Sequence, residues 1–368
     1  MKSPLTVKTC VTVGMLLVVC SLSAYSQGNH SKTLSGVSVV GSTIPTNGDV
    51  NPYGIVRVLQ SHGSLVEGNI LVSNFNNSMN LQGTGTTIVQ ITPDGTLSLF
   101  AQIDPGTLPG PCPGGVGLTT ALSVLRSGWV IVGSLPTTDG TFKTAQAGCL
   151  LVLNSNGKVV ETFYGSLING PWDMTWMDQG GTANLFVSNV LNGTKAGGGK
   201  VVRGGTVVRL TINNLFGKIP RLQSMTVIGS NFPERTDPAA LVIGPTGLGL
   251  SPDASLLYVA DSLGNRIAAI PDPVFRETSA GISATVSQGG FLSDPLGLAV
   301  SSDGTILTVN GNNGLLVETT ADGDQILTTL LDNSGTPPGA GALFGLVPVP
   351  GQGLYYVDDA SNTLNLFK

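Results

Sequence analysis

Residues 245–267 decide the fold, and they read Pro245-Thr-Gly-Leu-Gly-Leu-Ser-Pro-Asp-Ala-Ser-Leu-Leu-Tyr-Val-Ala-Asp261-Ser-Leu-Gly-Asn-Arg-Ile267. Apolar residues alternate through two short runs, which is the pattern of β-strands with one buried face. A Ser-Pro-Asp turn separates the runs, and the second run ends at Asp261. A short loop then leads into a third run. The stretch therefore predicts three antiparallel strands joined by tight turns.

The same unit recurs along the chain, which is typical of repeat architectures. A second clear copy begins at Pro295 and continues into a fourth strand at 325–331, and weaker copies begin near residues 52, 119, 171 and 343. When the copies are aligned at the end of the second strand, the same position is polar in all six, and we call this set the polar column. Its members, with consecutive members 49 to 72 residues apart, are Asn74, Ser134, Asn189, Asp261, Asn310 and Asp359. Each step matches one four-stranded propeller blade of about 40–50 residues plus a loop. In the longest step, we expect residues 195–205 and 231–240 to be loops.

The two ends of the chain predict how the ring closes. The last copy, residues 343–368, has only three strands, whereas residues 36–41 form an isolated apolar strand near the start. Pairing this strand with the last one completes a sixth blade and removes two open sheet edges. The predicted fold is an all-β, six-bladed propeller closed by its N-terminal strand, favoured over seven blades or an open solenoid.

The first 26 residues predict an export signal. Lys2 and Lys8 precede an apolar run, and small residues follow at Ala24 and Ser26. Cys20 follows the bulky Val19, so a lipoprotein anchor at Cys20 is the less favoured alternative. No later apolar run approaches the roughly 20 residues of a membrane-spanning helix. We therefore expect a secreted or periplasmic protein with one propeller domain over residues 27–368.

Composition narrows the class of partner. Charged residues make up 11% of the chain, the net charge is −5, and no basic cluster occurs, which argues against nucleic acid as a partner. Cys112 and Cys149 are the two cysteines beyond the signal. In an oxidising compartment they predict a disulfide, with two separate buried thiols as the alternative. We expect a monomer.

Three motifs carry a resemblance to known propellers. Pro245-x-Gly247, Tyr258-Val-Ala-Asp261 and Asn265-Arg-Ile267 resemble an NHL repeat. The whole mature chain is similar to the superfamily that contains NHL propellers, gluconolactonases, senescence-marker proteins and streptogramin lyases. The motif is specific for the fold and weak for function, because propellers host many unrelated activities.

The gluconolactonase resemblance implies a divalent metal held by Glu, Asn and Asp where inner strands begin. The family's Asn-Gly falls on Thr246-Gly247, and its Asp-Gly falls on Leu296-Gly297. Its Glu has no counterpart near Asn51-Pro52. Calcium and magnesium need several oxygen ligands. We therefore predict that the family's metal site is lost and that the chain carries no metal or other cofactor.

The start of each first strand and the end of each second strand share one face around the central channel, where propellers usually bind ligands. At the middle position of the Pro-x-Gly motif or its equivalent, the six blades carry Tyr53, Thr120, Trp172, Thr246, Leu296 and Phe344. Aromatic rings beside amide and carboxylate groups suit a sugar, a lipid-like molecule or a peptide. The ligand-binding candidates are Tyr53, Trp172, Phe344, Asn74, Asn189, Asp261, Asn310 and Asp359. The alternative is that these residues have structural roles. The aromatic side chains would then pack adjacent blades together, and the Asn or Asp side chains would form hydrogen bonds with the backbone of their own loops. For Asp261 we prefer this structural interpretation.

Few catalytic chemistries remain. The chain has two histidines, His30 in the N-terminal tail and His62 in a turn on the opposite face, so a histidine base or multi-histidine zinc site is disfavoured. A carboxylate pair drawn from Asp173, Asp261, Asp294 and Asp359 stays open as acid and base. The glycine-rich run 196–200 lacks the setting of a phosphate loop. We predict no catalytic residue.

Three hypotheses about function follow. The first is a secreted, non-catalytic propeller that binds a small molecule or a protein through its channel face. The second is a gluconolactonase-like hydrolase with a rebuilt site. The third is a structural or cell-surface interaction module.

Overall fold

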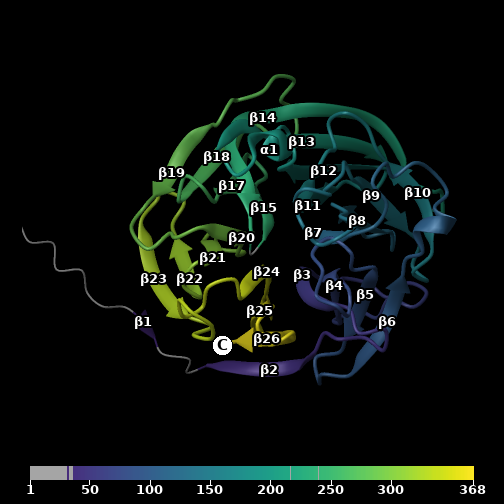
Figure 1. Ribbon diagram of the computed structural model, residues 1–368, viewed down its shortest axis with the longest axis horizontal. Helices are drawn as coiled ribbons and strands as arrows, with labels where there is room; N and C mark the ends of the chain where they lie inside the picture. Colours follow the sequence, from purple (N-terminus) through teal and green to yellow (C-terminus); the bar gives the residue numbers. More distant parts are fainter. Residues whose placement is uncertain (1–30, 33–35, 216, 239) are drawn as a thin grey trace, which may run out of the picture. The chain divides into compact units, whose positions relative to one another are not determined.

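A computed structural model describes residues 31–32, 36–215, 217–238 and 240–368. The predicted export signal, residues 1–26, and the candidates Cys20 and His30 lie outside these residues. Six β-sheets of four or five strands surround a central axis, as Figure 1 shows for this part of the chain. The predicted six-bladed all-β propeller is confirmed.

The blades follow one another along the chain, each starting with its innermost strand. Blade 1 contains β3 (Val50–Arg57), β4 (Ile70–Asn76), β5 (Thr87–Ile91) and β6 (Leu97–Gln102). Blade 2, after the short 3-10 helix η1 (Pro105–Thr107), contains β7 (Leu118–Val124), β8 (Val130–Ser134), β9 (Cys149–Leu153) and β10 (Val159–Phe163). Blade 3 contains β11 (Pro171–Asp178), β12 (Thr182–Asn189), helix α1 (Thr194–Gly197), β13 (Val202–Asn213), β14 (Arg221–Asp237) and β15 (Leu241–Ile243).

The second half of the ring repeats the arrangement. Blade 4 contains β16 (Pro245–Leu250), β17 (Leu256–Asp261), β18 (Arg266–Pro271) and β19 (Ala284–Gln288). Blade 5 contains β20 (Pro295–Val300), β21 (Ile306–Asn310), β22 (Leu315–Thr319) and β23 (Gln325–Leu330). Blade 6 contains β24 (Leu343–Val349), β25 (Gly353–Asp358), β26 (Thr363–Phe367) and β2 (Val37–Ser42). The inner strands of successive blades contact one another all the way round, including β24 with β3.

The ring closes as the two chain ends predict. Strand β2 lies beside β26 (Figure 1) and pairs with it in antiparallel fashion. In this register Val39 is opposite Asn365. A further pairing was not predicted: β1 (Ser31–Lys32) lies parallel to β23 and adds a fifth strand to blade 5. Both pairings cover strand edges that would otherwise be open.

Glycine explains the Pro-x-Gly motif in physical terms. At Gly247, Gly297 and Gly345 an added Cβ atom would collide with the backbone of the next inner strand around the ring. A side chain at this position would push adjacent blades apart. Blades 2 and 3 differ, because Ala121 follows Thr119-Thr120 and Asp173 follows Pro171-Trp172 in place of the glycine.

Two expectations for the long step in blade 3 were wrong. Residues 231–240 are not a simple loop, because β14 extends to Asp237 and turns back into β15. Residues 195–205 include part of helix α1 and the start of β13. The alternation of buried Phe232, Glu234 and Thr236 with more exposed neighbours is a strand pattern, which the polar composition of the stretch obscured.

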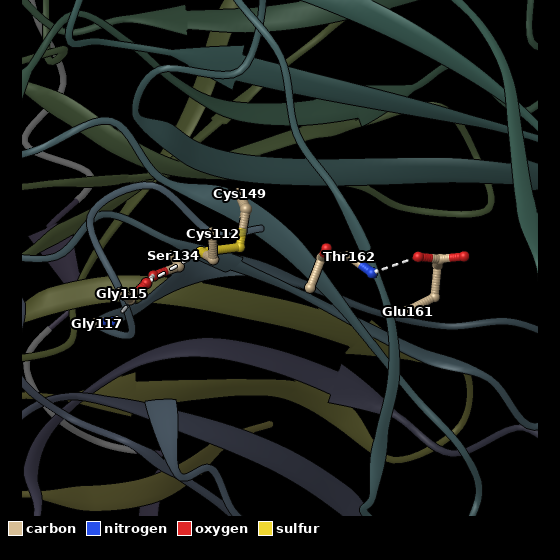
Figure 2. The surroundings of a disulfide bond; sticks show 7 residues. All are labelled: Cys112, Gly115, Gly117, Ser134, Cys149, Glu161 and Thr162. Atoms are coloured by element: carbon tan, nitrogen blue, oxygen red, sulfur yellow. Dashed lines mark hydrogen bonds between the residues drawn. A yellow bond between two sulfur atoms is a disulfide. The ribbon is translucent and has the colours of Figure 1, made fainter. Parts of the chain in front are cut away.

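A disulfide joins Cys112 to Cys149 within blade 2, as predicted, with Cα atoms 5.2 Å apart. Figure 2 shows that the Ser134 hydroxyl lies close by. It donates to the Gly115 carbonyl (2.8 Å) and accepts from the Gly117 amide (3.0 Å). The disulfide and these bonds fix the loop before β7 against the blade.

No helix in the described residues is long and apolar enough to cross a membrane.

Candidate functional site

The inner strands all begin at one face of the ring, here called the upper face, and end at the lower face. Tyr53, Trp172 and Phe344 lie just after the start of their strands and meet inside the channel. The Tyr53 and Phe344 rings stack with centroids 3.9 Å apart, and Trp172 lies 6.4 Å and 6.3 Å from them. Phe75 stacks on Tyr53 at 4.5 Å. These four rings form what we call the aromatic plug.

The plug is closed off from solvent. Its side chains are 1–3% exposed, so the rings contact one another and not an open surface. We call residues 231–238 and 240–243 the cap, and its residues 240–243 pack against the plug. Trp172 Nε1 donates to the Val242 carbonyl (3.1 Å), and Ala240 and Leu241 belong to the same apolar cluster as the plug. The three aromatic candidates therefore lie in a buried, packed cluster.

The asparagine candidates lie at the ends of second strands, as expected, and are fully buried. Asn74 Nδ2 donates to the Thr43 carbonyl (3.1 Å), and Asn310 Nδ2 donates to the Phe291 carbonyl (2.7 Å). Asn189 Nδ2 makes a longer bond to the Val187 carbonyl (3.4 Å). These amides hold loop and strand backbone, which matches the structural alternative for the column.

Asp261 is held by its own hairpin. Its Oδ1 accepts from the Gly264 amide (3.1 Å), and its Oδ2 accepts from Arg266 Nε and Nη2 (3.0 and 2.9 Å). Both side chains of this ion pair are at most 6% exposed. Burial raises the pKa of Asp261, and the Arg266 charge opposes that rise. These are the hairpin bonds that the structural interpretation of Asp261 expects.

Asp359 differs from the rest of the column. The strand register places Asp358, not Asp359, opposite Leu343, because Asp359 lies one residue beyond β25. In the orientation that satisfies its neighbours, the Asn51 amide donates to both Asp359 oxygens (2.5 and 3.0 Å). Burial, and then the Asp358 charge, raises the pKa of Asp359 to about 7.

A second carboxyl near the upper mouth is also perturbed. Burial, followed by the Asp237 charge, raises the pKa of Asp294 to about 6. Asp237 pairs with Arg235 at 3.2 Å, so the cap carries a charged pair. Burial and the Asp359 charge hold the pKa of the Tyr53 hydroxyl well above its usual value. The upper mouth is thus acidic, and its carboxyls bond neighbouring residues.

The accessible hollow at the upper face lies above the cap. It is a groove of about 460 Å³ between the cap and the loop that joins β8 to β9. Its walls are Gln82, Gly140, Thr141, Phe142, Lys143, Gly199, Arg235, Thr236, Asp237, Pro238 and Leu241. Leu241 has a φ of 62°, which is unusual for a branched side chain and marks a strained turn. Sequence reasoning missed this groove, because its walls come from separate blades.

The residues at the family's metal positions do not fit a divalent cation. The Thr246 hydroxyl is fully buried and donates to the Pro295 carbonyl (3.0 Å), and it also shares a hydrogen bond with Ser262. Leu296 lies in the apolar core, and at the first blade the aromatic Tyr53 follows Asn51-Pro52. Among the described residues, no group of three His, Cys, Asp or Glu could hold a metal ion. We therefore derive no step through a metal.

His62 lies where expected, in the turn between β3 and β4 at the lower face. Its Nε2 is 3.0 Å from the Arg126 carbonyl, and the bond is exposed to solvent. It is on the opposite side of the channel from the plug and groove. His62 is therefore not part of a site at the upper face.

Comparison with known proteins agrees on the fold. No family model and no curated protein matches the chain. A calcium-binding regucalcin from Agrobacterium tumefaciens is 13% identical, with a TM-score of 0.56 over 89% of this chain and 93% of that one. A gluconolactonase from Xanthomonas campestris is 14% identical, with a TM-score of 0.52 over 87% of each chain. A streptogramin B lyase is 13% identical, with a TM-score of 0.50 over 90% of this chain and 97% of that one.

The class of protein follows from these findings. The chain is a six-bladed β-propeller with the fold of regucalcin and gluconolactonase, as the sequence motifs suggested. Its upper mouth departs from the metal pattern that the resemblance implied. An aromatic plug and a cap occupy that position in this chain.

Proposed function

We propose that the chain is exported and acts as a non-catalytic, monomeric propeller that binds a small amphipathic ligand in the groove above the cap. The observation that carries the proposal is the groove itself. It has a volume of about 460 Å³ and lies on the face where propellers usually bind ligands.

The lining of the groove supports an amphipathic ligand. Phe142 and Leu241 offer apolar contact, and exposed Lys143 offers a positive charge at the rim. Arg235 and Asp237 add a charged pair on the opposite wall. A ligand with an apolar body and a carboxylate would satisfy both kinds of wall.

Export is supported by the residue pattern of 1–26 and by the cysteine pair. Disulfides persist in oxidising compartments and are rare in the cytosol. Fractionation of cells that produce the full chain tests this part. The mature protein should start near residue 27 and be found outside the cytoplasm. Recovery of the uncleaved chain from the cytosol would contradict it.

Lack of catalysis is supported by the side chains at the upper mouth. Thr246 and Leu296 stand where the resemblance implied oxygen ligands, and Leu296 packs in the same apolar cluster as the aromatic plug. A thermal-shift scan with calcium, magnesium, manganese, zinc and a chelator tests this. We expect no shift, since a ligand at a hundredfold excess over Kd would add about 2.7 kcal/mol to the folded state. A chelator-reversible rise would favour the hydrolase hypothesis, and lactone turnover would then be measured.

The groove is tested with a panel of short-chain carboxylates, sugars, amino acids and dipeptides. A compound that raises the melting temperature should bind at least about tenfold more weakly to Phe142→Ala, because the apolar contact is lost. Lys158→Ala is the matched control, since Lys158 is exposed on a distant hairpin of the same blade. Compounds that bind both variants equally would place the site elsewhere.

A further inference from the structure

A second cavity lies in the central channel, below the aromatic plug. Its volume is about 230 Å³, and residues from all six inner strands line it, among them Ile55, Leu122, Asp173, Leu248, Leu298 and Leu346. The lining residues nearest the lower face, such as Trp176 and Pro348, are partly exposed. The plug separates this cavity from the groove above the cap. A ligand would therefore reach it from the lower face.

Asp173 is the only ionisable side chain among the residues that line this cavity. Its Oδ2 accepts from the Leu248 amide (2.8 Å), and its own amide donates to the Ser188 hydroxyl (3.1 Å). Burial raises the pKa of Asp173 to about 7, and hydrogen bonds from the Leu248 and Met174 amides oppose that rise. No cationic side chain contributes to the shift. The carboxyl thus lacks a counter-charge, and that is costly inside a protein.

Two buried hydroxyls on β7 also line the cavity without partners. Thr120 is 5% exposed and Ser123 is 0% exposed, and neither Oγ atom makes a hydrogen bond within the described part of the chain. Buried polar groups are normally paired. Asp173 is therefore the group that can offer a charge to a ligand in this cavity.

We infer that the lower channel is a binding site for a small primary amine, which pairs its ammonium group with the Asp173 carboxylate. The five leucines on the wall hold a short carbon chain. The volume of the cavity limits the ligand to a small molecule.

The test is calorimetric titration of the full chain with n-butylamine, and with 1-butanol as the neutral analogue. We expect the amine to bind and the alcohol not to. Affinity should be about tenfold weaker at pH 6 than at pH 8, because the carboxyl must ionise to pair. The amine stays protonated throughout, so binding at pH 6 should release about one proton, seen as a heat that differs between buffers.

Two variants separate charge from space. Asp173→Asn keeps an oxygen acceptor for the Leu248 amide and should weaken amine binding about 30-fold or more. Ala299→Leu fills the cavity without altering its charge and should also abolish binding. Equal binding of butanol, unchanged affinity in either variant, or no heat at either pH would each overturn the inference.

Discussion

Trp172→Ala is the substitution that most directly tests the role of the aromatic plug. If Trp172 packs the channel mouth, its loss should unfold the protein more readily. If it is a ligand-binding residue held at a surface, stability should hardly change. The structure favours the first outcome, because the indole is 3% exposed and touches both Tyr53 and Phe344.

The magnitude comes from two contributions. Truncating a buried tryptophan to alanine costs about 3–5 kcal/mol, and the lost Nε1 bond to Val242 adds about 0.5–1.5 kcal/mol. We therefore expect about 4–6 kcal/mol for Trp172→Ala. Trp172→Phe keeps a ring and leaves the Val242 carbonyl unpaired, which should cost about 1–3 kcal/mol.

Urea unfolding with the disulfide intact measures both variants, with a common slope as the check that the unfolded state is unchanged. Trp129→Ala is the matched control, since Trp129 lies partly exposed at the β7–β8 turn and should cost less. A loss below about 1 kcal/mol for Trp172→Ala would refute the packing role. The ligand-binding interpretation of the plug would then return.

Three further predictions concern stability. Replacing Cys112 and Cys149 with serine should destabilise the fold by about 4 kcal/mol in the chain-entropy model, since the disulfide closes a loop of 37 residues. Urea unfolding measures this loss, and unchanged stability would contradict the prediction. Glu234 is 0% exposed and burial raises its pKa to about 8, so its native form keeps a proton that the unfolded chain loses near pH 4.5. The free energy of unfolding should therefore fall by roughly 3–4 kcal/mol from pH 5 to 8, and Glu234→Gln should remove that fall. If the stability difference between the original protein and Glu234→Gln does not change with pH, the prediction is wrong. Arg266→Met leaves Asp261 buried without its partner and should lower the free energy of unfolding by about 3–5 kcal/mol. The same urea assay measures this, and a loss near zero would mean that water replaces the guanidinium.

Local patterns were enough to predict the scaffold. The alternation in 245–267 and its recurrence predicted the strands, because a half-buried strand has a side-chain period of two wherever it lies. The unpaired strand at 36–41 predicted closure, because an open edge is unfavourable in any sheet. The cysteine pair followed from their number and the expected compartment.

The candidate site was only partly predictable. The sequence correctly grouped Tyr53, Trp172 and Phe344 at one mouth, since they share a position in the repeat. It did not show that the rings contact each other, because that depends on the channel radius and on the cap. The cap was missed because a polar stretch such as 231–238 resembles a loop unless its burial is known.

The sequence by itself determined the repeat and the closure of the ring, because each is a matter of residue type at a fixed position in a blade. Only the tertiary structure decided which of those positions face solvent. Burial at the channel depends on side chains from six blades at once. For that reason the aromatic candidates became a plug, and Asp173 became an unpaired charge facing a cavity.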